Sequence, residues 1–116
     1  MDKKIQQTLQ ILEECASEKK LINYNVLYKQ IGLNTENPAD RNTGSKILGE
    51  VSRITLEKNK TMLSSIATLK ENQSPAYGFY ELAIELGLLK KSANEEEKFV
   101  FWAKQFTKVF QTYGKQ

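Results

Sequence analysis

Residues 23 to 69 read NYNVLYKQIGLNTENPADRNTGSKILGEVSRITLEKNKTMLSSIATL, and this stretch carries the pattern from which the fold is predicted. The pattern predicts a short helix over 24–31, a polar connection over 34–43 and a second helix over 44–58. An apolar, β-branched run over 62–69 then predicts a strand. This order indicates a mainly helical unit that is completed by a short strand.

Both central helices have boundary signals in the sequence. Asn23 is a suitable N-cap for the first, and Gly32 follows its last apolar residue, where a left-handed conformation ends a helix at little cost. Asn42 or Thr43 is expected to cap the second. The apolar side of the second helix carries Ile47, Leu48, Val51 and Ile54, and the other side carries Lys46, Gly49, Glu50, Arg53 and Glu57. One side is therefore expected to pack against the first helix, and the other to face solvent or a ligand.

The flanking segments predict three further helices. The first covers 3–19, with an apolar stripe of Ile5, Leu9, Leu12 and Ala16, and Leu21 and Ile22 after it are candidates for a very short strand. Another covers 79–86 and is closed by Gly87, after which Leu88 and Leu89 are expected to continue into the core. The last begins at a capping box formed by Asn94 and Glu97. Its aromatic stripe predicts that Trp102 is buried with Phe99 and Phe106.

The polar tip over 70–75 is interpreted as an exposed loop after the predicted strand, with a short return over 76–79. Helix, loop, helix and strand is the order of a helix-turn-helix followed by a wing, although the connection over 34–43 is longer than such a turn usually is. We therefore predict a mainly α fold with a small β wing (α+β). It is expected to be one winged-helix-like domain over 1–116 with additional N- and C-terminal helices.

The residue types that are missing limit the possible chemistry. The chain contains no histidine and a single cysteine, Cys15, which excludes Ser-His-Asp and Cys-His catalysis and zinc sites built from histidine or several thiolates. The glycines are scattered and form no phosphate-binding loop, and the acidic residues form no magnesium or calcium motif. We expect a protein that is not an enzyme and has no catalytic residues, metal site or cofactor. Cys15 is interpreted as a buried or half-buried structural thiol.

Length and hydropathy indicate a soluble protein. A chain of 116 residues can form one apolar core, and no apolar run approaches the ~20 residues needed to cross a bilayer. The N-terminal residues lack the apolar block of a secretory signal, and one cysteine allows no intrachain disulfide. We expect a cytoplasmic protein without a membrane partner.

Charge is the remaining functional evidence. The net charge is +3, and residues 41–60 hold five basic and two acidic residues, so the excess of this segment equals that of the whole chain. A basic patch centred on the second helix makes double-stranded DNA the expected partner. The candidate nucleic-acid-binding residues are Arg41, Thr43, Ser45, Lys46, Gly49, Arg53, Lys58, Lys60 and Lys70. The alternative is that Lys46, Glu50 and Arg53, which stand at helical pair spacings, form salt bridges with one another.

Two resemblances agree with this arrangement. Residues 23–33, NYNVLYKQIGL, followed by LGEV at 48–51, resemble the winged-helix segment of the DNA alkyltransferase and alkyltransferase-like family. The reactive Pro-Cys-His-Arg motif of that family is absent, so alkyl transfer is not implied. Residues 63–69 and 74–83, LSSIATL and SPAYGFYELA, look like a group of small bacterial and phage proteins of no agreed activity, some linked to nucleases of mobile elements. The resemblances imply winged-helix architecture and a setting in bacteria or their mobile elements.

Two functions from different classes follow. The first is a small non-enzymatic DNA-binding protein, a regulator or accessory factor of a bacterial phage or mobile element. The second is a protein-binding module that inhibits or modulates a host defence protein. Glu50 and Glu57 separate the two, because carboxylates on a DNA-facing surface are tolerated only when they are paired. The aromatic last helix, widened by Val100 and Phe101, is a further candidate contact for a protein partner or a homodimer.

Overall fold

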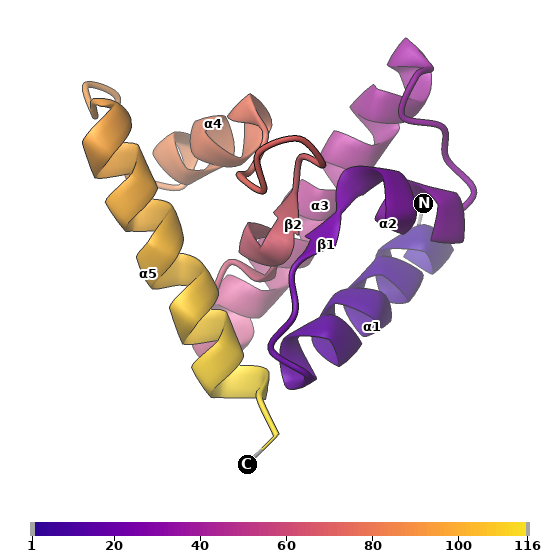
Figure 1. Cartoon of the computed structure of the whole chain (residues 1–116), viewed down its shortest axis with the longest axis horizontal. Coiled ribbons are helices and arrows are strands. Elements are labelled where there is room, and N and C mark those ends of the chain that lie inside the picture. Colours follow the sequence, from indigo (N-terminus) through magenta and orange to yellow (C-terminus); the bar gives the residue numbers. More distant parts are fainter. Residues whose placement is uncertain (1, 116) are drawn as a thin grey trace.

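The computed structural model describes residues 2–115, which are mostly helical (Figure 1). The helices are α1 (Asp2–Ser17), α2 (Tyr24–Gln30), α3 (Pro38–Asn59), α4 (Tyr77–Glu85) and α5 (Glu95–Tyr113), with a 3-10 turn η1 (Leu63–Ile66). Strands β1 (Ile22–Asn23) and β2 (Ala67–Thr68) form a parallel two-stranded sheet, in which Ile22 pairs with Ala67 and Asn23 with Thr68. The predicted mainly helical fold with a small β component is confirmed. No helix within residues 2–115 is long and apolar enough to cross a membrane.

The first two helices end close to where the sequence predicts. α1 ends at Ser17, slightly before the predicted limit, and Lys19 beyond it has a left-handed backbone with a φ of 55°. The side chain of Asn23 caps α2 by accepting a hydrogen bond from the backbone amide of Val26 (3.0 Å). Gly32 follows α2 with a φ of 77°. Caps are local features, which is why the sequence predicts them well.

α3 begins earlier than predicted. The side chain of Asn37 caps it by accepting hydrogen bonds from the amides of residues 39 and 40 (2.8 and 3.2 Å), and Pro38 occupies the first turn. The predicted loop over 34–43 is therefore wrong from Pro38 onward, and Asn42 and Thr43 lie inside the helix instead of capping it. Asparagine followed by proline is a turn signal, but the same pair is also a favourable helix start, because proline lacks the amide hydrogen that a first turn leaves unpaired.

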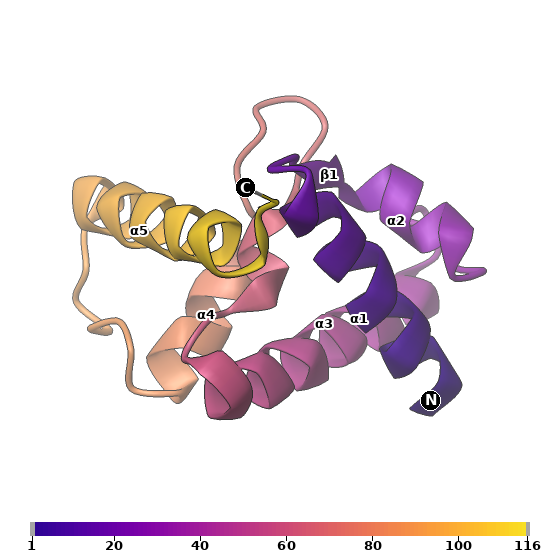
Figure 2. The same cartoon turned by 90° about the horizontal axis from the view of Figure 1, so that it is seen from below.

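Residues 61–68 form the buried centre of the protein. The predicted strand over 62–69 is wrong for most of its length, since Leu63–Ile66 is a 3-10 turn and only Ala67–Thr68 is a strand. The turn η1 contacts α1, α3 and α5. Residues 69–76 then form a loop that projects from the helical body (Figure 2), and α4 begins at Tyr77 where a return strand was expected.

Polar side chains on neighbouring helices explain why this buried segment is not a strand. Ser52 Oγ accepts from the amide of residue 64 (3.1 Å), and Thr55 Oγ1 accepts from the amide of residue 63 (3.2 Å). From α5, Gln105 accepts from the amide of residue 62 (3.2 Å), and Trp102 Nε1 donates to the carbonyl of residue 65 (2.8 Å). These bonds pair the backbone without a strand ladder, so the segment can turn while buried.

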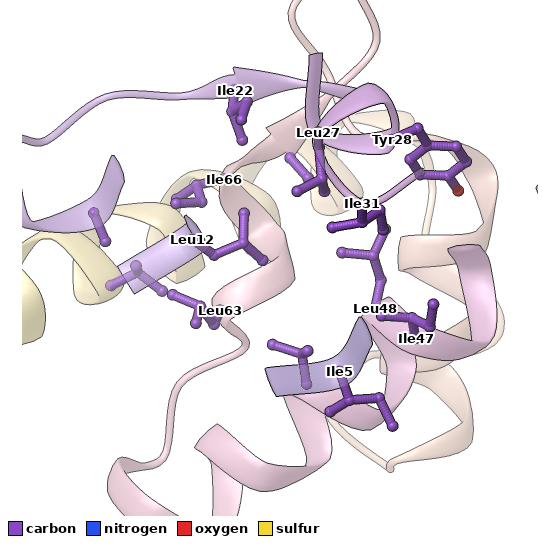
Figure 3. Close-up of a cluster of buried hydrophobic side chains, with 14 residues drawn as sticks. Ile5, Leu12, Ile22, Leu27, Tyr28, Ile31, Ile47, Leu48, Leu63 and Ile66 are labelled. Atoms are coloured by element: carbon purple, nitrogen blue, oxygen red, sulfur yellow. The ribbon is translucent and has the colours of Figure 1, made fainter. Parts of the chain in front are cut away.

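Buried apolar side chains form two neighbouring clusters. The larger joins α1, α2, α3 and η1, as Figure 3 shows for part of it, and its members include Leu12, Leu27, Ile31, Ile47, Val51, Leu63 and Ile66. The smaller lies between α4 and α5 and contains Met62, Phe79, Ala83 and Trp102. The predicted burial of Trp102 is confirmed, because 7% of it is exposed. α1 and α5 flank the centre and approach each other at their C-terminal ends (Figure 1). Lys115 N donates to Ser17 O there, at 2.9 Å.

Three residues expected in the core are exposed. Ile54 is 38% exposed, because η1 packs on the side of α3 that carries Ser52 and Thr55 and thereby turns Ile54 outward. Phe99 is 60% exposed, although its ring makes an edge-to-face contact with that of Trp102, with ring centroids 6.0 Å apart. Leu88 is 41% exposed in the loop after α4.

Candidate functional site

A half-open groove of about 920 Å³ lies between α2, α3, α4 and the 69–76 loop. It brings together six of the nine predicted nucleic-acid-binding residues, namely Arg41, Ser45, Lys46, Gly49, Arg53 and Lys70. Five of these come from α3, and the sixth comes from the loop on the opposite side. The groove is therefore the site at which the prediction can be examined.

The N-terminal half of α3 presents the most accessible side chains. Arg41, Ser45 and Lys46 are exposed, because the buried side of this helix is formed by Gly44, Ile47 and Leu48. The guanidinium of Arg41 donates to the carbonyl oxygen of Thr35 (3.0 Å), which orients it beside the start of the helix. Lys46 makes no ion pair with the side chains of residues 3–115.

Further along α3, Arg53 is held by two carboxylates. Its guanidinium lies 3.3 Å from Glu50 on the same helix and 3.0 Å from Glu85 on α4. The side chains are partly exposed, so these pairs contribute little to stability, but they fix where the arginine points. The predicted salt bridge between Glu50 and Arg53 is thus present, and a second carboxylate from α4 is added to it.

Gly49 lies beneath this ion-pair network. It was expected on the solvent side of α3, yet it is buried. A Cβ at this position would lie 3.3 Å from the guanidinium of Arg53 and 3.9 Å from Leu82 of α4. The solvent side of α3 is therefore covered at this turn, because α4 packs over it.

The charges that line the groove balance. Its cations are Arg41, Lys46, Arg53 and Lys70, and its carboxylates are Glu36, Glu71, Glu81 and Glu85. Four positive and four negative side chains leave no net charge. The basic excess over residues 41–60 is thus offset in space by glutamates from α4 and the loops.

The floor of the groove is apolar and aromatic. Leu48, Phe79 and Leu82 line it together with Tyr24. The hydroxyl oxygen of Tyr24 accepts a hydrogen bond from the amide of Ala76 (3.0 Å), which ties α2 to the start of α4. Burial raises the pKa of Tyr24 to about 12, so the phenol is neutral at physiological pH.

Three predicted site residues lie outside the groove. Lys58 is 4.0 Å from Glu13 of α1. Lys60 adopts the left-handed conformation that ends α3, and its carbonyl accepts from Lys108 of α5 (2.9 Å). Thr43 is half-buried on α3.

The carboxylates and the apolar floor from α4 were not predicted as part of the site. Glu81 and Glu85 stand four residues apart, so the sequence does place them on one face of a helix. The direction of that face depends on how α4 packs on α3. This packing is long-range, and no local signal predicts it.

The groove combines ion pairs, hydrogen-bonding groups and an apolar floor, which is the chemistry of a binding site. Over residues 3–115, no group of three or more acidic, histidine or cysteine side chains is placed to hold a metal. Cys15 lies half-buried outside the groove, and burial is the main cause that raises the pKa of its thiol. Comparisons with protein-family models, curated proteins and solved structures found no match.

Proposed function

We propose that the protein is a small non-enzymatic DNA-binding protein of winged-helix-like architecture. In this proposal α2 and α3 act as the helix-turn-helix, and the 69–76 loop stands where a wing would be. The order of α1, β1, α2 and α3 supports this, and so does the pairing of β1 with a strand that follows α3. The loop itself is closed by bonds from Leu69 N to Ser74 O (2.7 Å) and from Gln73 N to Leu69 O (3.1 Å).

Three exposed cations at the rim of the groove carry the proposal. Arg41, Lys46 and Lys70 have no carboxylate partner among residues 3–115, so each is free to contact a phosphate. Arg53 is different, because contact with a phosphate would require it to leave Glu50 or Glu85. Ser45 lies next to Lys46 on the exposed half of α3 and is placed to contact base edges or phosphates.

A second candidate is favoured by the balance of charge in the groove. An apolar floor with four cations and four carboxylates around it resembles a surface that receives a segment of another protein. In this alternative the module binds a protein partner through the same groove. A component of a host defence system, as inferred from the sequence, is one partner of this kind.

Duplex binding at two salt concentrations tests the first candidate. Lys46→Ala and Arg41→Ala are each expected to weaken binding to mixed-sequence duplexes, because each removes about one phosphate contact. Each should also lower the slope of log affinity against log salt by about 0.9. Lys91→Ala is the matched control, because Lys91 is exposed outside the groove and its removal changes the net charge equally.

Glu81→Gln adds a test with the opposite sign. Glu81 is exposed and lines the groove, so its carboxylate repels a phosphate backbone that lies across the groove. Replacement by glutamine is expected to tighten duplex binding at low salt. If the unmodified chain binds no duplex even at low salt, the DNA proposal fails and the protein-segment candidate takes its place.

A further inference from the structure

A second surface lies between α5 and the loop over 86–94 that precedes it, away from the groove. A hollow of about 440 Å³ is formed there by the apolar side chains of Leu88, Leu89, Val100 and Phe101. Leu88 is 41% and Val100 is 44% exposed, so this apolar area is open to solvent. Its charged lining residues are Lys90, Glu96, Glu97 and Lys104, and Glu97 is engaged in the capping box with Asn94.

One acidic and one basic residue lie at equal distances along α5 on either side of Val100. Glu96, Val100 and Lys104 are spaced by four residues, which places them in one row on the helix with the apolar residue in the middle. Both charged residues are exposed, and neither makes an ion pair within residues 3–115. When a second copy of this row runs in the opposite direction, its base lies opposite the acid of the first copy and its acid lies opposite the base. The row is therefore complementary to itself.

We propose that this row is a homodimer contact, in which two copies of α5 pack antiparallel about a two-fold axis at Val100. Glu96 then lies opposite Lys104 of the partner subunit, and the symmetry repeats this pair once. Val100 packs on Val100 of the partner subunit, and the partner subunit covers the hollow that Val100 lines. A parallel arrangement places glutamate opposite glutamate and lysine opposite lysine, so the charges select the antiparallel one.

Charge exchange provides the test. The unmodified chain is expected to show a monomer–dimer equilibrium by sedimentation over about 1 μM to about 1 mM, with weaker association at high salt. Glu96→Lys and Lys104→Glu should each weaken the homodimer by roughly tenfold or more, because two like-charge contacts form. An equimolar mixture of the two variants should associate again as a heterodimer, since both charge pairs are then restored. The double variant Glu96→Lys with Lys104→Glu should recover the homodimer.

Two controls keep the outcomes clear. Lys29→Glu makes the same change of charge as Lys104→Glu at an exposed position of α2 and is expected to leave association unchanged. Circular dichroism checks that each variant is folded. Val100→Asp removes the apolar centre and should abolish the dimer. A chain that stays monomeric up to the highest concentration overturns the proposal. So does a dimer that is indifferent to both single reversals, or a mixture that fails to associate. DNA or protein binding in the groove is measured separately and does not depend on this result.

Discussion

The ring of Tyr28 lies directly over Gly44, where α2 crosses α3. An ideal Cβ at residue 44 would come within 2.2 Å of Cζ and of the hydroxyl oxygen of Tyr28. Both residues are buried, and Tyr28 is 6% exposed. Glycine within a helix is destabilising by up to about 1 kcal/mol relative to alanine. Here its lack of a side chain is what allows the two helices to approach.

Gly44→Ala is therefore expected to destabilise the protein by about 1–3 kcal/mol, because the tyrosine ring must move. Chemical denaturation measures the change. Gly78→Ala in α4 is the control, since a Cβ there meets only Ser45 Oγ at 3.6 Å and should be tolerated. Combining Gly44→Ala with Tyr28→Leu should cost less than the sum of the single changes. Additive effects would contradict the proposed contact.

Ser52 and Ser65 are both buried, but their replacement by alanine is expected to change stability in different ways. Ser52 Oγ lies 2.6 Å from Ser64 Oγ and accepts from the amide of that residue, so Ser52→Ala leaves buried polar groups unpaired. A loss of about 1–3 kcal/mol is expected. Ser65 Oγ is buried without a hydrogen-bond partner among the described residues, so Ser65→Ala should be neutral or stabilising. An equal loss of stability in Ser52→Ala and Ser65→Ala would show that the hydrogen bonds of Ser52 do not stabilise η1.

Trp102 is the only tryptophan and reports on the cluster between α4 and α5. Its burial predicts a fluorescence maximum shifted to shorter wavelength than that of hydrated indole. Trp102→Ala should cost roughly 3 to 5 kcal/mol. Trp102→Phe should cost less, because it keeps much of the packing and loses the hydrogen bond to the carbonyl of Ser65. An emission maximum of fully hydrated indole in the folded protein would contradict this placement.

Tyr24 predicts a loss of stability at alkaline pH. Burial raises its pKa from 10.0 to about 12, against the opposing effect of the hydrogen bond from Ala76. The folded state therefore keeps the phenol proton where the unfolded state loses it. The stability contribution is complete below pH 10 and disappears as the pH rises from 10 to 12. Tyr24→Phe should make the dependence in this window shallower by up to about 1.4 kcal/mol per pH unit, measured by denaturation at several pH values. The same slope in both proteins would exclude this origin.

The helix boundaries that the sequence predicts correctly depend on local chemistry. Asn94 and Glu97 form the predicted capping box of α5, with bonds of 2.8 and 3.2 Å, because the partners are three residues apart. The burial of Trp102 follows from the helical spacing of the aromatic residues. Asn37 and Pro38 are also a local signal, but one that allows both a turn and a helix start, and the sequence alone leads to the wrong choice between them.

The composition of the segment over 62–69 predicts a buried strand, but most of the segment is a 3-10 turn. Its conformation depends on Ser52 and Thr55, which lie on another helix and bind its backbone. No spacing in the sequence reveals such a pairing across separate elements. The exposure of Ile54 has the same origin, since the turn packs on the side of α3 that carries Ser52 and Thr55.

In the candidate site, too, some features follow from the sequence and others depend on tertiary packing. The amino-acid order places Ser45 and Lys46 on the second central helix and predicts a local excess of positive charge, because these properties follow from periodicity and from counting residues. Arg41 is predicted in the connection and belongs to α3 only because Asn37 and Pro38 start that helix earlier. The packing of α4 on α3 brings Glu81 and Glu85 into the same groove, pairs Arg53 with Glu85 and covers Gly49. Charge along a chain is additive, but charge at a surface depends on which elements meet there. The groove is therefore neutral although the segment that forms one side of it is basic.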